Sequence, residues 1–373
     1  MLIDIKCSSL SDVENLESKW KTIEESANPD FMMKWIWIST WIDCATQHFK
    51  DDFLYNIYVL EGYENDEIIS IAIFVKNKSV RRRIIKSTQL HLHNTGNSTL
   101  DSIFQEYNQI LSKKGYEKKA SEETIKFLLK ENKSIPMWDE IIIQNTAPET
   151  LQNMLTSDLK HEILSESSDY IVDLENLRNE KSTYIESLSK QTRYHIRKSN
   201  RLYNESGEFE LIFASSPEEA FSFLTEAAEM HRKRWENKNG YSQFDYEPFI
   251  TFHQSLMQNA WQSHGVDIAK IVVGDKHVGT IYNFINNDTV DFYLCAFSYE
   301  ENNKFKPGLS SFALLIEHYL KSGFKTFNFM NGDSPYKLKL GNADRKSVTA
   351  RLYKPRFLFL IEDIAKSIKN KLR

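Results

Sequence analysis

Four polar segments in the second half of the sequence carry the residue types that chemistry requires. In chain order they are residues 193–201 (RYHIRKSNR), 231–235 (HRKRW), 306–310 (KPGLS) and 332–337 (GDSPYK). Arginine and lysine suit the binding of anions, while histidine, tyrosine and lysine can exchange protons or stabilise a developing charge. These residue types point to anion binding combined with acid–base chemistry.

The segment 306–310 is a Pro-Gly turn that opens a predicted helix. The apolar residues after it recur at helical spacing: Leu309, Phe312, Ala313, Ile316, Tyr319 and Leu320, with Gly323 as the stop. A turn at a helix N-terminus leaves main-chain N–H groups unpaired and adds the positive end of the helix dipole. We therefore predict a phosphate seat at Lys306, Pro307, Gly308, Leu309 and Ser310.

The arginines of the first segment lie on one stripe of a helix predicted from about residue 181 to residue 204. Arg193, Arg197 and Arg201 recur every four residues. Such a stripe is either a solvated face or a clamp that holds a phosphate through bidentate guanidinium contacts. Both interpretations stay open at this point.

His231 and Trp235 fall on one face of a helix that begins at Ser216-Pro217, and Arg234 lies beside them. A histidine four residues from a tryptophan on a buried stripe is typical of a hydrogen-bonded core residue. Its ordinary pKa also suits a general base for an amine or a hydroxyl. Tyr241 follows in a predicted loop that has the character of a lid.

We predict the tail 333–341 to be a strand with Lys337 and Lys339 on one face. Lysines at such places protect an edge strand from pairing with another chain. The functional alternative is that Lys337 reaches the site and stabilises a phosphate or an oxyanion.

Short β-rich runs surround the Pro-Gly turn. Residues 271–273 and 279–284 read as a hairpin, 290–297 as the next strand, and 327–329 as a strand after the helix. The three cysteines are widely separated and form no metal-spaced pair, so we predict no metal site and a reducing compartment.

The first half shows a similar succession of elements. We predict a helix at 11–26, a hairpin at 53–60 and 68–75, helices at 99–113 and 121–131, and a strand at 138–144. The tryptophan-rich segment 31–49 is either a buried helix or a platform for stacking sugars. Because the order of elements resembles that of the second half, the two halves suggest a degenerate duplication of one domain.

Length and charge limit the partners. The chain has 373 residues, enough for two domains, and a formal net charge of −5, which gives no general attraction to DNA. It lacks an apolar leader and a membrane-length apolar run, so we expect a cytoplasmic protein. A basic amphipathic helix predicted at 357–373 either packs on its domain or contacts the inner face of the membrane.

The four segments, in this order and approximate spacing, resemble those of the CelD-like, or BcsL-like, acetyltransferases. These are duplicated GNAT proteins related to the Fem peptidoglycan aminoacyltransferases. The resemblance implies an α/β fold of two tandem GNAT-like domains, each a mixed, largely antiparallel sheet flanked by helices. It implies a degenerate domain at 1–160, an acetyltransferase domain at 161–355 and a terminal helix at 356–373.

The resemblance also implies roles for individual residues. Catalytic roles fall to His231, Lys337 and Tyr336. Acetyl-CoA, as co-substrate without a metal, would contact Ala296, Phe297, Lys306, Pro307, Gly308, Leu309 and Ser310. The acceptor would contact Arg193, Arg197, Arg234, Trp235, Tyr241 and Asp333.

The activity implied is N- or O-acetylation of a sugar or amino sugar during surface-polysaccharide synthesis. Two alternatives remain. A Fem-type enzyme would use aminoacyl-tRNA and a cell-wall precursor, and its tRNA binding would depend on salt. A non-catalytic accessory protein would have kept the fold and lost donor binding, and the turn's lack of the fuller Arg/Gln-x-x-Gly-x-Gly/Ala pattern of single-domain GNAT enzymes favours this reading.

Overall fold

The structure is a computed structural model that describes residues 3–48, 56–81, 84–130, 135, 137–236, 240–356 and 359. These residues form two compact units. The first unit comprises the described parts of Met1–Glu166 and Ser347–Arg373, and the second comprises Ser167–Lys346. No helix among the described residues is long and apolar enough to cross a membrane.

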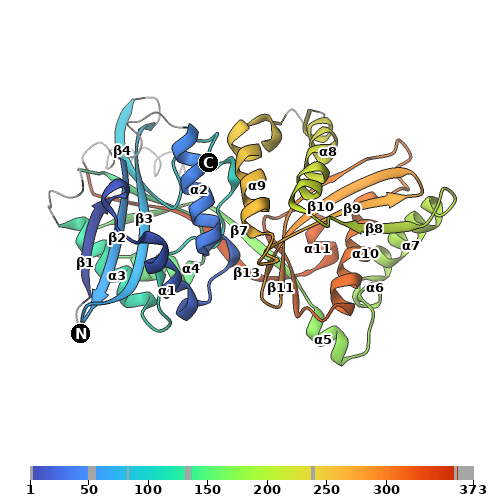
Figure 1. Cartoon of the computed structure of the whole chain (residues 1–373), viewed down its shortest axis with the longest axis horizontal. Helices are drawn as coiled ribbons and strands as arrows, with labels where there is room; N and C mark the ends of the chain where they lie inside the picture. The colour runs from blue at the N-terminus through green and yellow to red at the C-terminus, as the bar shows by residue number, and fades with distance from the viewer. Residues whose placement is uncertain are drawn as a thin grey trace, which may run out of the picture. The chain divides into compact units, whose positions relative to one another are not determined.

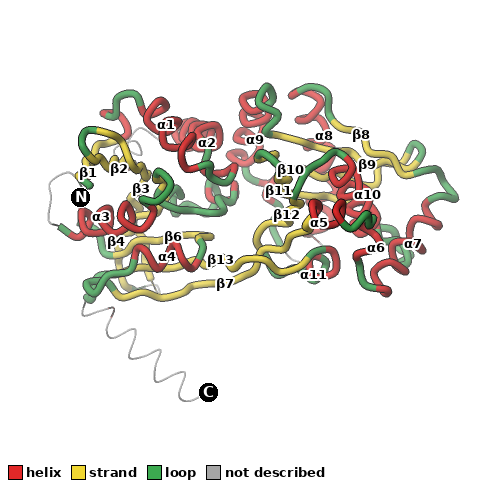
Figure 2. Tube along the Cα trace, turned by 90° about the horizontal axis from the view of Figure 1, so that it is seen from below, coloured by secondary structure: helices red, strands yellow, loops and turns green. Residues whose placement is uncertain are grey.

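The first unit is a mixed sheet with helices on both faces (Figure 2). Its elements are β1 (Asp4–Ser9), α1 (Leu16–Ala27), α2 (Trp35–His48), β2 (Ile57–Glu64), β3 (Glu67–Arg81), β4 (Ile85–Leu92), β5 (Leu111–Ser112), α3 (Glu117–Leu129), β6 (Glu140–Thr146), α4 (Pro148–Met154) and β13 (Asn342–Tyr353). The strand order is β1-β2-β3-β4-β6-β13, and β5 pairs with β3. Only β4 and β6 are parallel.

The second unit repeats this design (Figure 1). Its elements are β7 (Lys160–Asp173), α5 (Leu174–Asn179), α6 (Tyr184–Ser187), α7 (Lys190–Tyr203), β8 (Phe209–Phe213), α8 (Pro217–Glu236), α9 (Glu247–Ala260), β9 (Val266–Val273), β10 (Lys276–Asn286), β11 (Thr289–Phe297), α10 (Pro307–Lys321), β12 (Thr326–Asn331) and α11 (Lys337–Leu340). The strand order is β8-β9-β10-β11-β12-β7, with β11 and β12 parallel.

Apart from the short β5, the order of elements from β1 in the first unit matches the order from β8 in the second. Each begins with a strand, two helices, three antiparallel strands and a helix. Each ends with a strand parallel to the last of those three strands. In the second unit α8 packs against β9, β10 and β11 on one face, and α10 covers the other face together with α5, α6 and α7. The predicted α/β architecture, with two tandem mixed sheets flanked by helices, is confirmed.

The last strand of each sheet comes from a distant part of the sequence. β7 begins in the first unit and ends in the second, and β13 runs the other way. The residues of β13 from Val348 to Tyr353 pair with β6, so they belong to the first unit, whereas the sequence placed 161–355 in one domain. The helix predicted at 356–373 lies outside the described residues except for Arg356 and Phe359.

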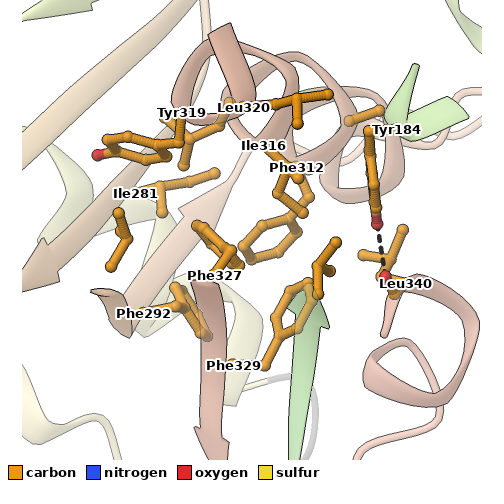
Figure 3. Packing of buried hydrophobic residues seen from close by; sticks show 14 of the residues in the cluster. Tyr184, Ile281, Phe292, Phe312, Ile316, Tyr319, Leu320, Phe327, Phe329 and Leu340 are labelled. Atoms are coloured by element: carbon orange, nitrogen blue, oxygen red, sulfur yellow. Dashed lines mark hydrogen bonds between the residues drawn. The ribbon is translucent and has the colours of Figure 1, made fainter. Parts of the chain in front are cut away.

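α10 is positioned by its apolar face. Phe312, Ile316 and Tyr319 are buried, and Phe312 packs edge-on against Phe327 and Phe329 of β12 (Figure 3). The same core takes in α6 and α11, because the Tyr184 hydroxyl donates a 2.6 Å hydrogen bond to the carbonyl of Leu340. This dense aromatic packing fixes where the N-terminus of α10 lies.

The tryptophan-rich segment is a buried helix. Within α2, Trp37 and Trp41 are buried, and the Trp37 indole donates a 2.6 Å hydrogen bond to Gln105. The interpretation of these two rings as a sugar-stacking platform is therefore wrong.

Two predicted elements are also wrong. Residues 99–113 are not one helix but a loop with a 3₁₀ turn at Asp101–Ile103 and the short strand β5. There Asp101 accepts hydrogen bonds from the main-chain N–H groups of Thr95 and Gly96, and such local bonds compete with a helix.

The tail 333–341 is not a strand, because Lys337–Leu340 forms α11. Gly332 has a φ of +119°, and the N–H of Lys337 bonds to the carbonyl of Ser334, so the chain turns instead of extending. Lys337 and Lys339 therefore do not share a strand face.

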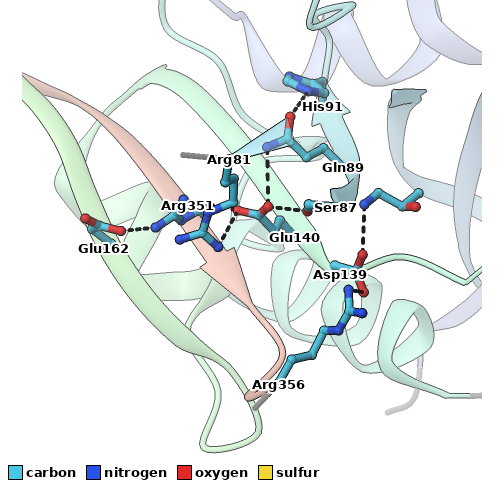
Figure 4. A network of polar contacts seen from close by, with 10 residues as sticks. Arg81, Ser87, Gln89, His91, Asp139, Glu140, Glu162, Arg351 and Arg356 are labelled. Carbon is cyan, nitrogen blue, oxygen red and sulfur yellow. Dashed lines mark hydrogen bonds and ion pairs between the residues drawn. The ribbon is translucent and has the colours of Figure 1, made fainter. Parts of the chain in front are cut away.

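A buried ionic network ties four strands of the first unit together (Figure 4). Glu140 on β6 is fully buried and lies 3.4 Å from Arg81 of β3 and 3.2 Å from Arg351 of β13. It also accepts a hydrogen bond from Ser87 of β4. Glu162 of β7 pairs with Arg351 as well, but Glu140 is the carboxylate that both guanidinium groups share, so we expect the sheet to depend on its charge.

Candidate functional site

The site is built around a fork between two parallel strands. β11 and β12 pair only where Thr289–Asp291 lies beside Thr326–Asn328, and then they separate. At the fork, the amide of Asn328 donates a 2.8 Å hydrogen bond to Asp291, and both side chains are buried. Beyond it, residues 292–297 of β11 pair with β10 on one side and with no described strand on the other.

This open edge meets the N-terminus of α10, the helix that connects the two strands. A crevice beyond the carboxyl ends of separated parallel strands is the usual ligand site of open α/β sheets. Because residues alternate along β11, some of its main-chain N–H and C=O groups point away from β10 into this crevice.

Two adjoining cavities occupy the crevice. The larger, of about 840 Å³, is lined by residues 292–297 of β11, by α8, and by residues 334–337 before and at the start of α11. The smaller, of about 440 Å³, lies at the turn that precedes α10. Arg234, Cys295, Lys306 and Tyr336 line both cavities.

The Pro-Gly turn presents unpaired main-chain donors. Pro307 is the first residue of α10, and no side chain caps this helix. The N–H groups of Gly308 and Leu309 have no hydrogen-bond partner among the described residues. Unpaired N–H groups at a helix N-terminus suit an anion, which is the role predicted for this turn.

Ser199 of α7 holds this turn in place. Its hydroxyl accepts a 2.9 Å hydrogen bond from the N–H of Lys306, and it lies 2.9 Å from the hydroxyl of Ser310. The Ser310 side chain is therefore buried beneath the turn rather than directed at a ligand.

The structure brings together most of the residues that the sequence assigned to the site. Those lining the larger cavity are His231, Arg234, Trp235, Ala296, Phe297, Lys306, Leu309, Tyr336 and Lys337. Pro307 and Gly308 line the smaller cavity.

Four predicted acceptor contacts lie outside these cavities. Arg193 donates to the carbonyls of Glu186 and Leu188 and so closes the turn before α7. Arg197 and Tyr241 are exposed and line neither cavity. Asp333 accepts from the N–H of Ser168 and the hydroxyl of Tyr170.

His231 does not fit the role of a base. Its Nε2 accepts a 3.1 Å hydrogen bond from the Trp235 indole, so Nδ1 carries the proton and donates to the Ser242 hydroxyl at 2.8 Å. Burial lowers the pKa of His231 to about 4. With both ring nitrogens engaged, this histidine positions Trp235 in the cavity wall and has no lone pair for a substrate proton.

Four buried histidines, two in each unit, should make the protein sensitive to acid. Burial lowers the pKa of His91, His93 and His231 to about 4 and that of His253 to about 3. The unfolded chain binds protons at the ordinary value of about 6.5, where the native state does not, so stability falls as the pH drops below about 6.5. Each histidine contributes up to about 1.4 kcal/mol per pH unit.

Melting curves at about pH 7 and pH 5 test this, because ordinary carboxylates stay ionised over that range. We expect both units to melt at a lower temperature at pH 5. Equal melting temperatures at the two pH values would contradict the assignment of these histidines as buried and neutral.

Lys337 and Tyr336 face the larger cavity from the other side. Lys337 is only 6% exposed, and its ammonium group donates to the carbonyls of Met330 at 3.1 Å and Asn331 at 2.6 Å. Tyr336 stacks on Phe312, and burial raises the pKa of its hydroxyl well above the ordinary value. The two carbonyl groups at the end of β12 thus hold the charged ammonium group of Lys337 at the cavity wall.

The lining of the larger cavity is positively charged. It contains Arg234, Lys306, Lys337 and Lys339 and no aspartate or glutamate among the described residues. The described chain also contains no group of three histidine, cysteine, aspartate or glutamate side chains that could hold a metal ion. An anionic ligand suits this cavity.

Two cavity or turn residues went unnoticed in the sequence. His195 lines the larger cavity, and Ser199 anchors the turn, one helical turn further along α7. Thr192, Ile196, Ser199 and Tyr203 are buried, so α7 turns this side toward α10 and the arginines away from it. The four-residue spacing of His195 and Ser199 places both on one side of α7, and this spacing was the signal in the sequence that could have identified them.

The corresponding fork in the first unit is closed. β4 and β6 pair at residues 89–91 with 140–142, and beyond this point Asn108 bridges them. Its side chain donates a 2.6 Å hydrogen bond to the carbonyl of Leu92, and its N–H donates to Asn145 at 3.1 Å. α3 begins with Glu117 instead of a Pro-Gly turn, and this carboxylate at the helix N-terminus disfavours a second anion there.

Comparison with known families and structures agrees with the geometry. A family model described as an acetyltransferase (GNAT) domain matches residues 190–338, which include α7, the Pro-Gly turn and the open fork. This part of the second unit is thus similar to GNAT acetyltransferase domains. No curated protein sequence matched the chain.

Three solved structures are similar to almost the whole chain. FemX has a TM-score of 0.58 at 11% identity, covering 92% of this chain and 97% of its own. L-PGS from Bacillus licheniformis has a TM-score of 0.52 at 11% identity, with coverages of 94% and 96%. A conserved protein of unknown function from Bacteroides thetaiotaomicron VPI-5482 has a TM-score of 0.50 at 12% identity, with coverages of 95% and 100%. At this identity the likeness concerns the fold, and it extends over both units.

Proposed function

We propose that the protein is an acyl-CoA-dependent N- or O-acetyltransferase that acts on a sugar or amino sugar in surface-polysaccharide synthesis. The observation that carries the proposal is the open fork of β11 and β12 with unpaired N–H groups of α10 at its mouth. The match of an acetyltransferase family model to the same residues supports it. The resemblance to CelD-like proteins supplies the class of acceptor.

The donor fits the crevice in stages. The N–H groups of Gly308 and Leu309 receive the diphosphate, and Lys306 and Arg234 add positive charge beside them. The pantetheine arm follows residues 292–297 of β11, where main-chain groups on the side away from β10 pair with its amides as a neighbouring strand would.

The thioester then lies at the wall formed by Lys337. As the acceptor attacks, negative charge develops on the carbonyl oxygen, and the fixed ammonium group of Lys337 and an N–H of β11 near Ala296 stabilise it. Trp235 and Tyr299 supply flat apolar walls, with Gln243 and Ser334 as polar contacts for the acceptor. No covalent enzyme intermediate is required.

Melting the protein with acetyl-CoA, desulfo-CoA or bulk tRNA tests the proposal. A donor at about 100 times its Kd stabilises the native state by about 2.7 kcal/mol, so acetyl-CoA and desulfo-CoA should both raise the melting temperature by several degrees. Stabilisation by tRNA alone would contradict acetyl transfer and favour an aminoacyl donor. No shift with any of the three would favour the non-catalytic accessory role.

A further inference from the structure

His195 lies between two cavities. One is the cavity of about 840 Å³ described above, here called the donor cavity, and the other is a second, polar cavity. His195 extends from the middle of α7 and lines the donor cavity together with Leu309 and Lys339. The same three residues line a cavity of about 610 Å³ on the other side, where serine, threonine, asparagine and glutamine side chains predominate among the polar lining. An acceptor in this second cavity therefore lies beside His195.

The imidazole of His195 is free, in contrast to the other histidine of the donor cavity. Its ring nitrogens have no hydrogen-bond or ion-pair partner among the described residues, and its ring contacts Tyr194 only at the edge. The ring is half-buried, so it is held by the helix yet open to the cavity. His231, by comparison, has both nitrogens engaged.

The remaining groups around the donor cavity are poor proton acceptors. No carboxylate lines it among the described residues. Burial raises the pKa of the Cys295 thiol to about 12 and the pKa values of the Tyr299 and Tyr336 hydroxyls above their ordinary range. The Tyr293 hydroxyl is bonded to buried His253, and the Lys337 ammonium group is committed as a donor. The second cavity has two carboxylates in its lining, but Asp173 caps α5 by accepting from the N–H of Asn176, and Glu180 accepts from the Asn176 amide. His195 is the imidazole that lines both cavities.

We propose that His195 is the general base of the transfer reaction, and this inference rests on the proposed function. Its neutral imidazole takes the proton from the amine or hydroxyl of the acceptor as the new C–N or C–O bond forms at the thioester carbon. The C–S bond then breaks, and the imidazolium proton goes to the departing CoA thiolate. The step needs no other reactant.

The test uses His195→Ala in the full chain, with acetyl-CoA as donor and D-glucosamine as acceptor probe. We expect the melting shift with acetyl-CoA to persist, because the anion seat is intact, while the rate of CoA thiol release falls by about 10²–10⁴-fold. Imidazole added to the solution should restore part of the lost rate, since the truncated side chain leaves room for it. His161→Gln, at an exposed histidine in the first unit, should change neither readout.

The outcomes separate this inference from the proposed function. If the unaltered chain shows no melting shift with acetyl-CoA, the proposed function fails. If it shows the shift but His195→Ala releases thiol at an unreduced rate, or is not rescued by imidazole, His195 is not the base and the donor site stands. Loss of the melting shift in His195→Ala, or donor binding by the unaltered chain without any glucosamine-dependent thiol release, would also overturn the assignment.

Discussion

Gly308→Glu should abolish the stabilisation by acetyl-CoA while the second unit still folds. The substitution places a carboxylate at the second residue of α10, where it occupies the unpaired N–H groups that would receive the diphosphate. A helix N-terminus tolerates glutamate, so the fold should survive, whereas an anionic donor meets like charge. Melting curves with and without acetyl-CoA measure the result, and we expect the shift of several degrees to vanish.

Two further variants control for shape and for net charge. A Cβ at position 308 would lie 3.2 Å from the Phe297 ring, so Gly308→Ala introduces the crowding without the charge and should weaken the shift only partly. Ser322→Glu adds the same charge at the far end of α10 and should leave the shift unchanged. If acetyl-CoA raised the melting temperature of Gly308→Glu as much as that of the unaltered chain, this turn would not be part of the donor site.

Glu140→Gln should destabilise the first unit by about 3–5 kcal/mol. The variant removes the charge that the buried guanidinium groups of Arg81 and Arg351 share, and of these two Arg351 keeps its ion pair with Glu162. Removing one partner from a buried ion-pair network costs far more than the loss of a surface ion pair. Folding of the second unit and its donor binding should be nearly unaffected, because the network of Figure 4 lies within the first unit.

Denaturation followed by tryptophan fluorescence measures this loss. Five of the seven tryptophans, Trp20, Trp35, Trp37, Trp41 and Trp138, belong to the first unit. Glu149→Gln, at an exposed glutamate in α4, is the matched control and should stay within about 0.5 kcal/mol of the unaltered chain. Equal midpoints for Glu140→Gln and this control would show that the sheet does not depend on the network.

The parts of the fold with strong periodic patterns were readable from the sequence. The β-rich runs 279–284 and 290–297 predicted β10 and β11, and most of their residues are buried. The helical spacing that begins at Leu309 predicted α10, because that helix buries one regular face. The Pro-Gly turn marked the start of α10 because proline suits the first helical position. These elements place the candidate site, and for this reason its general location could be predicted.

The elements and roles that were predicted wrongly depend on contacts with residues remote in sequence or on polar side chains that form local hydrogen bonds. The loop around Asp101 carries no periodic signal for its bonds to Thr95 and Gly96, and α11 follows from a turn at Gly332. The state of His231 was set by Ser242, which lies beyond the end of its helix. A residue's freedom to accept a proton depends on such partners, and spacing does not reveal them.

The exchange of terminal strands has a consequence for biosynthesis. On the ribosome, all residues of the second unit up to Lys346 emerge before the strand that completes the first sheet, since Val348–Tyr353 must still be translated. The N-terminal part therefore waits with the outer edge of β6 uncovered, which exposes unpaired main-chain groups to other nascent chains. Maturation is thus expected to run against the usual order, with the second unit finished first and the sheet of the first unit completed last.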